Sequence, residues 1–307
     1  MTPSKQNSNF LIKKTRALAK DWLLQHKNYW LNPMSIFSIY RAITGKVRIS
    51  PNFIIFGAAK CGTTSLYEYL VSHPSVYSSV WKEIFYFDRY YDRGINWYCG
   101  HFENKIRYFI DKNISNKKKI CGEATPTYIH NPLTVQRIHD DFPEMKLIAL
   151  LRNPVDRAYS HYQMEIRLGY ETNSFEDALE LENERLKNEL NKIYSNKNYY
   201  SYRRQIFSYK MGGLYAQHLK MWLNYFSKDQ ILVIGTEEFE KDPAYHFKKI
   251  ESFLEIPHKK IEFKKYNVGK YDKINEKTRS ELTKFFEPHN KELYKLLNHD
   301  FGWNQND

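Results

Sequence analysis

The chain has little cysteine and no long apolar run. Its three cysteines, Cys61, Cys99 and Cys121, are widely spaced and form no CxxC pair, which excludes a disulfide scaffold and indicates a reducing compartment. No segment approaches the roughly 18 consecutive apolar residues that a membrane helix needs, and the amino terminus lacks the apolar core of a signal peptide. We therefore expect a soluble, cytoplasmic protein.

Acidic residues are also in short supply. The 307 residues include 35 Asp and Glu against 47 Lys and Arg, a net charge of +12. Such an excess favours an anionic partner: nucleic acid, a phosphorylated or sulfated small molecule, or an acidic membrane face. Residues 1–50 hold nine basic residues and one aspartate, so they carry +8 of the total. The excess is therefore mainly a property of an amino-terminal extension and does not by itself identify an active site.

The boundary of this extension divides the chain into two predicted parts. We expect a basic extension over residues 1–50 and one domain over residues 51–307, because no linker interrupts the second part. Within the extension, residues 11–24 mix apolar side chains with lysines and an arginine. This segment is either a basic amphipathic helix on an anionic membrane or a solvated helix packed on the domain.

Short apolar runs alternate with helical patterns along the second part. A hydrophobic content of 42% and an aromatic content of 16% exclude a disordered chain. The runs that predict buried strands are residues 53–56, 147–151 and 231–234, with weaker candidates at 120–123 and 76–81. Helical patterns follow the first three runs, which predicts a single-domain α/β fold with a mostly parallel sheet flanked by helices. A last helix is expected over residues 276–297, with a break at Pro288.

The first apolar run leads into a loop suited to phosphate or sulfate. Residues 57–64 read Gly-Ala-Ala-Lys-Cys-Gly-Thr-Thr and precede a helical pattern, so backbone N–H groups and the positive end of a helix dipole would face an anion there. The Walker pattern of nucleotide kinases requires Lys directly after its second Gly. Here Thr63 follows Gly62, and Lys60 lies two positions before that glycine. The loop therefore departs from the Walker pattern at its most diagnostic residue.

The loop and several later segments together resemble sulfotransferases that use 3′-phosphoadenosine 5′-phosphosulfate (PAPS). The resemblance is nearest to the branch of heparan sulfate sulfotransferases and bacterial carbohydrate sulfotransferases, and it implies their P-loop-like fold. The matching segments are residues 51–66, 82–88 (KEIFYFD), 94–98 (GINWY), 122–128 (GEATPTY), 151–160 (LRNPVDRAYS) and 213–226. One such motif alone would be weak, but their common order makes the resemblance specific.

The resemblance implies roles for residues at the matching positions. Lys60 would neutralise the 5′-phosphate and the leaving oxygen, and Arg152 and Ser160 would hold the 3′-phosphate. The residues expected to bind the nucleotide are Lys60, Cys61, Gly62, Thr63, Thr64, Ser65, Arg152, Ser160, Gly269, Lys270 and Tyr271. Arg157 is as consistent with a structural ion pair as with a ligand contact. For Arg152 the structural alternative is an ion pair with Asp156.

An acceptor group must lose a proton as it attacks sulfur, so a general base is expected. Glu83 occupies the position of the catalytic glutamate in the resembling branch, and neighbouring aromatic residues are expected to desolvate it. If Glu83 is not the base, we expect it to be an exposed acid paired with Lys82. Glu123 is a second candidate for the base, but its sequence context is more typical of a buried structural acid. Three histidines are further candidates for the base but match no motif position: His101, His130 and His161.

The sequence thus predicts an enzyme that moves a sulfuryl group from PAPS to a hydroxyl or amine by in-line displacement, without a metal ion. The acceptor implied by the resemblance is a carbohydrate or glycolipid, and a small alcohol or phenol is the competitor within the class. A P-loop nucleotide kinase and a basic module that binds nucleic acid are the rivals from other classes. We expect no nucleic-acid partner, and peripheral membrane contact through the basic amino terminus.

Overall fold

The computed structural model describes residues 36–114, 119–264 and 271–304 of the chain. The chain divides into two compact units, Met1–Tyr40 and Arg41–Asp307. The predicted amphipathic segment 11–24 lies outside the described residues.

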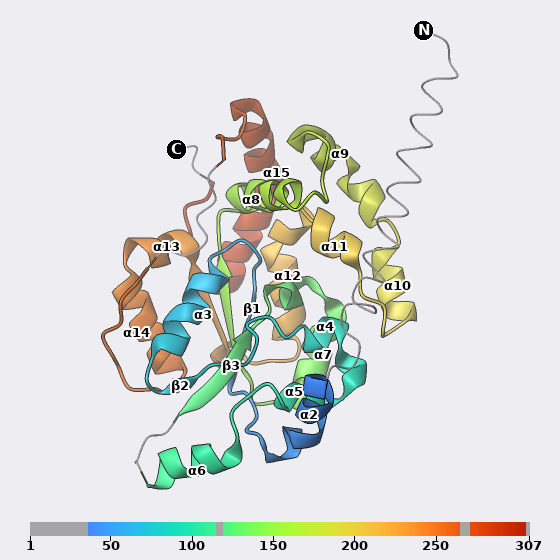
Figure 1. The fold of residues 1–307 in the computed structure, drawn as a ribbon. Helices are drawn as coiled ribbons and strands as arrows, with labels where there is room; N and C mark the ends of the chain where they lie inside the picture. Colours follow the sequence, from blue (N-terminus) through green and yellow to red (C-terminus); the bar gives the residue numbers. More distant parts are fainter. Residues whose placement is uncertain (1–35, 115–118, 265–270, 305–307) are drawn as a thin grey trace. The chain divides into compact units, whose positions relative to one another are not determined.

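Five parallel strands form the centre of the second unit, in the order β2-β3-β1-β4-β5 (Figure 1). The strands are β1 (Phe53–Gly57), β2 (Val76–Tyr77), β3 (Ile120–Ala124), β4 (Lys146–Leu151) and β5 (Ile231–Gly235). Each residue of β1 and β3 is buried, as expected for strands covered on both faces by helices. The predicted α/β fold with a parallel sheet is therefore confirmed.

Helices connect the strands and cover the sheet (Figure 1). The α-helices are α2 (Ile36–Thr44), α3 (Thr63–Ser72), α4 (Tyr86–Arg89), α5 (Ile95–Cys99), α6 (Lys105–Asn113), α7 (Pro132–Asp141), α8 (Pro154–Arg167), α9 (Phe175–Leu186), α10 (Glu189–Ser195), α11 (Tyr202–Phe207), α12 (Tyr215–Leu223), α13 (Thr236–Lys241), α14 (Pro243–Phe253) and α15 (Glu276–Leu297). Short 3-10 turns are η1 (Gly45–Val47), η2 (Tyr91–Arg93), η3 (Pro126–His130), η4 (Met211–Gly213) and η5 (Lys228–Gln230). No helix among the described residues combines the length and the apolar character that crossing a bilayer requires.

Two sequence expectations differ from the observed elements. The candidate strand 76–81 is only two residues long, because its pairing with β3 ends at Tyr77. The predicted break at Pro288 is wrong, since α15 runs through it without interruption. Proline removes one backbone hydrogen bond and costs about 3 kcal/mol in a helix. Buried Phe286 and Leu293 on either side of the proline anchor both halves of α15 in the core.

The carboxyl ends of β1, β3, β4 and β5 lie at one edge of the sheet, because all the strands run in the same direction. The predicted phosphate loop follows β1, Arg152 follows β4 and α13 starts after β5, while Glu123 is the last residue but one of β3. In open α/β sheets, ligands bind at this edge. The topology therefore brings together most of the residues that the sequence singled out.

Candidate functional site

The loop between β1 and α3 has the backbone expected of an anion-binding turn. Gly62 caps α3 with φ of +85°, a left-handed conformation that glycine adopts without strain. Lys60 is also left-handed, with φ of +72°, which costs a non-glycine residue free energy and is typical of functional loops. No side chain caps α3 through Gly62, so the first N–H groups of the helix can bind an anion.

Side chains of this loop differ in what they offer a ligand. Cys61 and Thr63 are buried, whereas Thr64 and Ser65 are partly exposed. Burial raises the pKa of the Cys61 thiol to about 11, so the thiol is neutral and faces the interior. A ligand can therefore meet Cys61 only through its backbone, while the hydroxyls of Thr64 and Ser65 remain within reach of solvent.

Lys60 belongs to a group of positive charges. Burial lowers the pKa of the Lys60 ammonium, and the positive charges of Arg167 and Arg152 lower it further, against the opposing charge of Glu165. The Lys60 Nζ atom lies 3.7 Å from Met164 Sδ on α8. Cations that disfavour one another's charged state are stabilised by an anion placed among them. Arg167, which the sequence analysis did not single out, thus adds to the charge around Lys60.

Helix α8 starts directly after β4 and carries the second predicted phosphate contact. Arg152 is half-buried at the end of β4, and Ser160 is buried on α8. Asp156, the alternative partner of Arg152, forms its ion pair with Arg279. Tyr271 contacts the same helix, with its ring centroid 5.6 Å from that of Tyr159. The neighbouring Gly269 and Lys270 lie outside the described residues.

Arg157 has a structural partner. Its guanidinium is buried and donates hydrogen bonds to the backbone carbonyls of Ser208 and Tyr209. It also lies against Gly212, where an added Cβ would come within 2.9 Å of Nη1. Arg157 therefore fastens α8 to the segment that precedes η4.

Three residues that the sequence analysis assigned no role connect the predicted phosphate loop after β1 with the segment after β4 that carries Arg152. Tyr215 donates a hydrogen bond of 2.9 Å to the carbonyl of Arg152, and its hydroxyl lies 3.7 Å from the Cys61 sulfur. At the start of α13, Thr236 Oγ1 donates to the carbonyl of Cys61 at 2.9 Å, and Glu237 Oε1 accepts the Asn153 N–H at 2.8 Å. Of these three residues, only Tyr215 lies in a segment that matches the sulfotransferase pattern, residues 213–226, so it alone could have been singled out from the sequence.

Glu83 lies on a partly exposed stretch between β2 and α4. Its side chain is 37% exposed, and Oε1 accepts a hydrogen bond of 2.8 Å from Lys82 Nζ. The rings of Tyr86 and Phe87 do not enclose it but pack with Tyr98, at centroid distances of 4.7 and 5.0 Å. A partly exposed carboxylate remains accessible to an acceptor from solution.

Glu123, at the end of β3, is fully buried and has four hydrogen-bond donors. Oε1 accepts from the hydroxyls of Tyr98 at 3.0 Å and Tyr128 at 3.1 Å. Oε2 accepts from Thr125 Oγ1 at 2.5 Å and from the Ile84 N–H at 3.3 Å. Burial raises the pKa of Glu123 to about 7, and these donors offset only part of that effect.

The same strand end holds the backbone around Glu83. The Ala124 N–H donates to the carbonyl of Lys82 at 3.1 Å, and the Ile84 N–H donates to Glu123. Both peptide groups that flank Glu83 are thus tied to β3. Glu123 acts on the stretch that carries Glu83 and is not itself exposed to a substrate.

His101 and His161 are buried and held by other groups, whereas His130 is partly buried. His161 Nε2 lies 3.3 Å from Glu165 Oε1, and His101 Nδ1 lies 2.9 Å from the carbonyl of Trp97. Burial lowers the pKa of His101 to about 4 and lowers those of His130 and His161 as well. All three are therefore neutral near pH 7.

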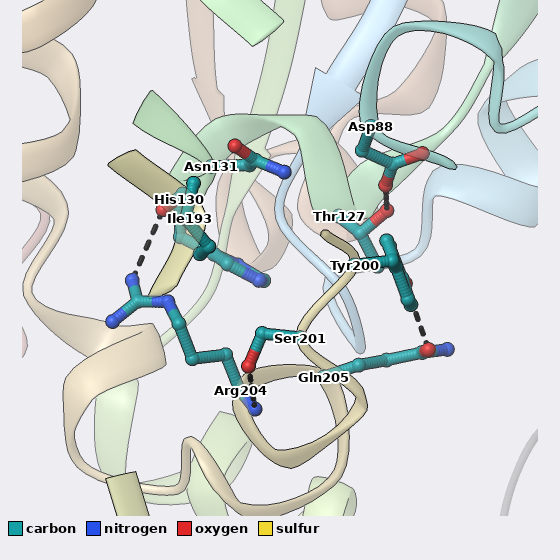
Figure 2. Close-up of a pocket in the computed structure, with 9 residues that line it drawn as sticks. All are labelled: Asp88, Thr127, His130, Asn131, Ile193, Tyr200, Ser201, Arg204 and Gln205. Atoms are coloured by element: carbon teal, nitrogen blue, oxygen red, sulfur yellow. Dashed lines mark hydrogen bonds between the residues drawn. The ribbon is translucent and has the colours of Figure 1, made fainter. Parts of the chain in front are cut away.

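A small polar pocket, which includes His130, is lined by residues of α4, η3, α10 and α11 (Figure 2). Its lining residues are Asp88, Thr127, His130, Asn131, Ile193, Tyr200, Ser201, Arg204 and Gln205. Asp88 Oδ2 accepts from Thr127 Oγ1 at 2.8 Å, while Asp88 Oδ1 and Arg204 Nε are buried without a hydrogen-bond partner. The pocket has room for about one water molecule, which could serve these polar atoms. It is too small for a nucleotide or a sugar.

No group of three or more His, Cys, Asp or Glu side chains that could hold a metal ion is present among the described residues.

Comparisons with known proteins agree with the geometry of the site. Residues 50–302 match the sulfotransferase domain family. The chain is 33% identical to the membrane-associated sulfotransferase kil1 of Dictyostelium discoideum, in an alignment that covers 85% of this chain and 68% of kil1. It is 28% identical to heparan sulfate glucosamine 3-O-sulfotransferase 6 of Mus musculus, over 82% of this chain and 73% of the mouse protein.

A solved structure extends the similarity to the fold. The sulfotransferase from Alicyclobacillus acidocaldarius superposes with a TM-score of 0.62 and 32% identity, over 84% of this chain and the whole of the bacterial chain. The family match spans most of the described unit, including Lys60 and Arg152. The chain therefore belongs to the sulfotransferase domain family and is a sulfotransferase.

Proposed function

We propose that this sulfotransferase moves a sulfuryl group from PAPS to a hydroxyl or amine of a carbohydrate acceptor. The observation that carries the proposal is the position of Lys60 and Arg152, which follow the neighbouring parallel strands β1 and β4 at one edge of the sheet. Besides burial, the charge of Arg152 also lowers the pKa of Lys60. A nucleotide with two separated phosphate groups fits two separated sets of donors at one sheet edge.

The loop residues would hold the two ends of PAPS. The N–H groups at the start of α3, with Thr64 and Ser65, would bind the 5′-phosphosulfate, and Arg152 with Ser160 would bind the 3′-phosphate. Tyr271 stands beside α8, where a nucleotide ring or ribose could contact it. Gly269 and Lys270 remain proposed contacts on resemblance alone.

The transfer itself needs positioning and charge stabilisation more than covalent help. The acceptor oxygen or nitrogen would attack sulfur, its proton would pass to the Glu83 carboxylate, and the bond from sulfur to the bridging oxygen would break. Lys60 would stabilise the charge that develops on that oxygen. The products are the sulfated acceptor and 3′-phosphoadenosine 5′-phosphate (PAP).

Calorimetric titration with PAP, without Mg²⁺, tests the donor site. Lys60→Ala and Arg152→Ala should each weaken binding at least about tenfold, since each removes a charge-assisted contact. The matched control is Lys228→Ala, which removes an exposed lysine outside the site. If the wild type does not bind PAP, or if it prefers ATP in the presence of Mg²⁺, the proposed PAPS site is wrong and the loop is better explained as that of a nucleotide kinase.

Glu83→Gln tests the base. We expect kcat to fall by about 10²- to 10⁴-fold with PAP affinity unchanged, because proton transfer is lost and nucleotide binding is not. Desulfated heparan-type polysaccharide and a simple phenol are the two acceptors to compare. The carbohydrate proposal is supported by the heparan sulfate relative, and turnover of the phenol alone would replace it.

We also propose that the enzyme works in the cytoplasm, as a basic extension over residues 1–50 and a catalytic domain over 51–307. The three cysteines are all free and buried, in keeping with a reducing compartment. The charge of the extension suits an anionic membrane surface, and the name of the Dictyostelium relative describes it as membrane-associated.

A further inference from the structure

Helix α6 carries an exposed apolar face that the transfer reaction does not use. Its residues Ile106, Phe109, Ile110 and Ile114, the last at the carboxyl-terminal cap, are 74%, 60%, 43% and 73% exposed. Their spacing of three, four and eight residues places them on one side of the helix, within about 140° of its circumference. We call these four residues the α6 face.

The opposite side of α6 faces the protein. Tyr108 packs against the hydrophobic core, and Asp111 accepts a hydrogen bond from the Tyr77 hydroxyl. None of the nine residues of α6 is buried. The helix is thus held along one side only, and the α6 face is directed away from the fold.

Two lysines flank the α6 face on one side, and an ion-paired arginine flanks it on the other. By helical geometry Lys105 and Lys112 lie along one flank, and Arg107 lies along the other. The nearby acids are already ion-paired: Glu103 with Arg107 at 3.0 Å, and Asp111 with Lys119 at 3.1 Å. An apolar stripe bordered by lysines is the pattern of helices that lie in a bilayer interface.

From these observations we propose that the α6 face binds the surface of an anionic lipid bilayer. The apolar side chains would enter the boundary between headgroups and acyl chains, and Lys105 and Lys112 would bind the lipid phosphates. This contact lies outside the basic extension, so it is a second membrane contact in addition to the one proposed for residues 1–50.

The position of α6 decides how the enzyme would sit on the membrane. The helix lies close to the amino-terminal end of β3, whereas α8 and the phosphate loops follow the carboxyl ends of the strands (Figure 1). A bilayer bound at α6 would leave the nucleotide site open to the aqueous phase. The proposal therefore favours an acceptor that arrives from solution.

The experiment is co-sedimentation of the full chain with vesicles of phosphatidylcholine, with and without phosphatidylserine. The double variant Ile106→Ser/Phe109→Ser should lower the partition onto phosphatidylserine vesicles at least about tenfold, because two membrane-inserted side chains are lost. The matched control is Tyr194→Ser/Tyr245→Ser, which replaces two aromatic residues that are also exposed but lie outside α6. This variant should bind phosphatidylserine vesicles as the wild type does.

Two further arms separate the sources of binding. Lys105→Glu/Lys112→Glu should weaken binding to phosphatidylserine vesicles, and Lys13→Glu/Lys14→Glu reports the contribution of the extension. Wild type that binds neither vesicle, or an α6 variant that binds as wild type, would overturn the proposal. So would a dimer by light scattering that becomes a monomer in the α6 variant, since a second copy would then cover the face. PAP affinity should be unchanged in every α6 variant, so the donor site is tested separately.

Discussion

Replacing Glu123 by glutamine should change the pH dependence of stability more than stability itself. The carboxyl is fully buried, and burial raises its pKa from the ordinary 4.5 to about 7. Between these two pH values the folded protein binds the proton more tightly than the unfolded chain does. Stability from this group is therefore greatest below about pH 4.5 and is lost as the pH rises to about 7.

The size of that loss follows from the separation of the two pKa values. Each pH unit contributes about 1.4 kcal/mol, so the full loss is about 3 kcal/mol. Glutamine has nearly the same shape and does not titrate. It leaves at least one of the four donors without an acceptor, a cost of about 1–3 kcal/mol that does not depend on pH.

Urea unfolding at pH 4.5 and pH 8 measures the difference. The free energy of unfolding of Glu123→Gln, relative to wild type, should rise by about 3 kcal/mol between the two pH values. The control Glu281→Gln alters an exposed carboxylate and should shift by less than about 0.5 kcal/mol. A difference between Glu123→Gln and wild type that stays constant with pH would refute the reasoning, because the carboxyl would then titrate alike in both states.

Two other substitutions test contacts that pack the site. Arg157→Leu should lower the free energy of unfolding by about 2–5 kcal/mol, because two backbone carbonyls lose their buried donor. If this variant instead keeps its stability and loses PAP affinity, Arg157 is a ligand-binding residue. Gly122→Ala should abolish folding, judged by circular dichroism, because its Cβ would lie 2.3 Å from the Phe53 carbonyl oxygen. Gly169→Ala, with φ of +73° and open space around it, should cost only about 1 kcal/mol, and equal stability of the two alanine variants would contradict the packing argument.

The strands of the sheet were predictable because their signal is local. The runs that became β1, β4 and β5 are short, apolar and followed by helical periodicity, as strands buried on both faces must be. Pro288 shows the limit of local reasoning. Its effect on the backbone is local, but the packing that keeps α15 continuous comes from residues elsewhere in the fold.

In the candidate site, too, local sequence predicted some features and tertiary packing decided others. Lys60, Arg152 and Glu83 were found from motif positions, whereas the desolvation expected around Glu83 did not follow from its aromatic neighbours in sequence. The rings of Tyr86 and Phe87 pack with Tyr98 and leave the Glu83 side chain 37% exposed. Which aromatic rings meet depends on where α4 and α5 pack, and adjacency in sequence does not determine this.

The sequence by itself determined the order of the strands along the chain, the glycine-rich composition of the loop after β1 for which we propose anion binding, and the location of the excess charge. These properties depend on composition and on spacing within a few residues. Only the tertiary structure decided that Tyr215 joins the loops of Cys61 and Arg152, and that Glu123 holds the peptide beside Glu83. Such contacts connect residues between 39 and 154 positions apart. They form only when the parallel strands have paired, because pairing is what brings the carboxyl ends of distant strands to one edge.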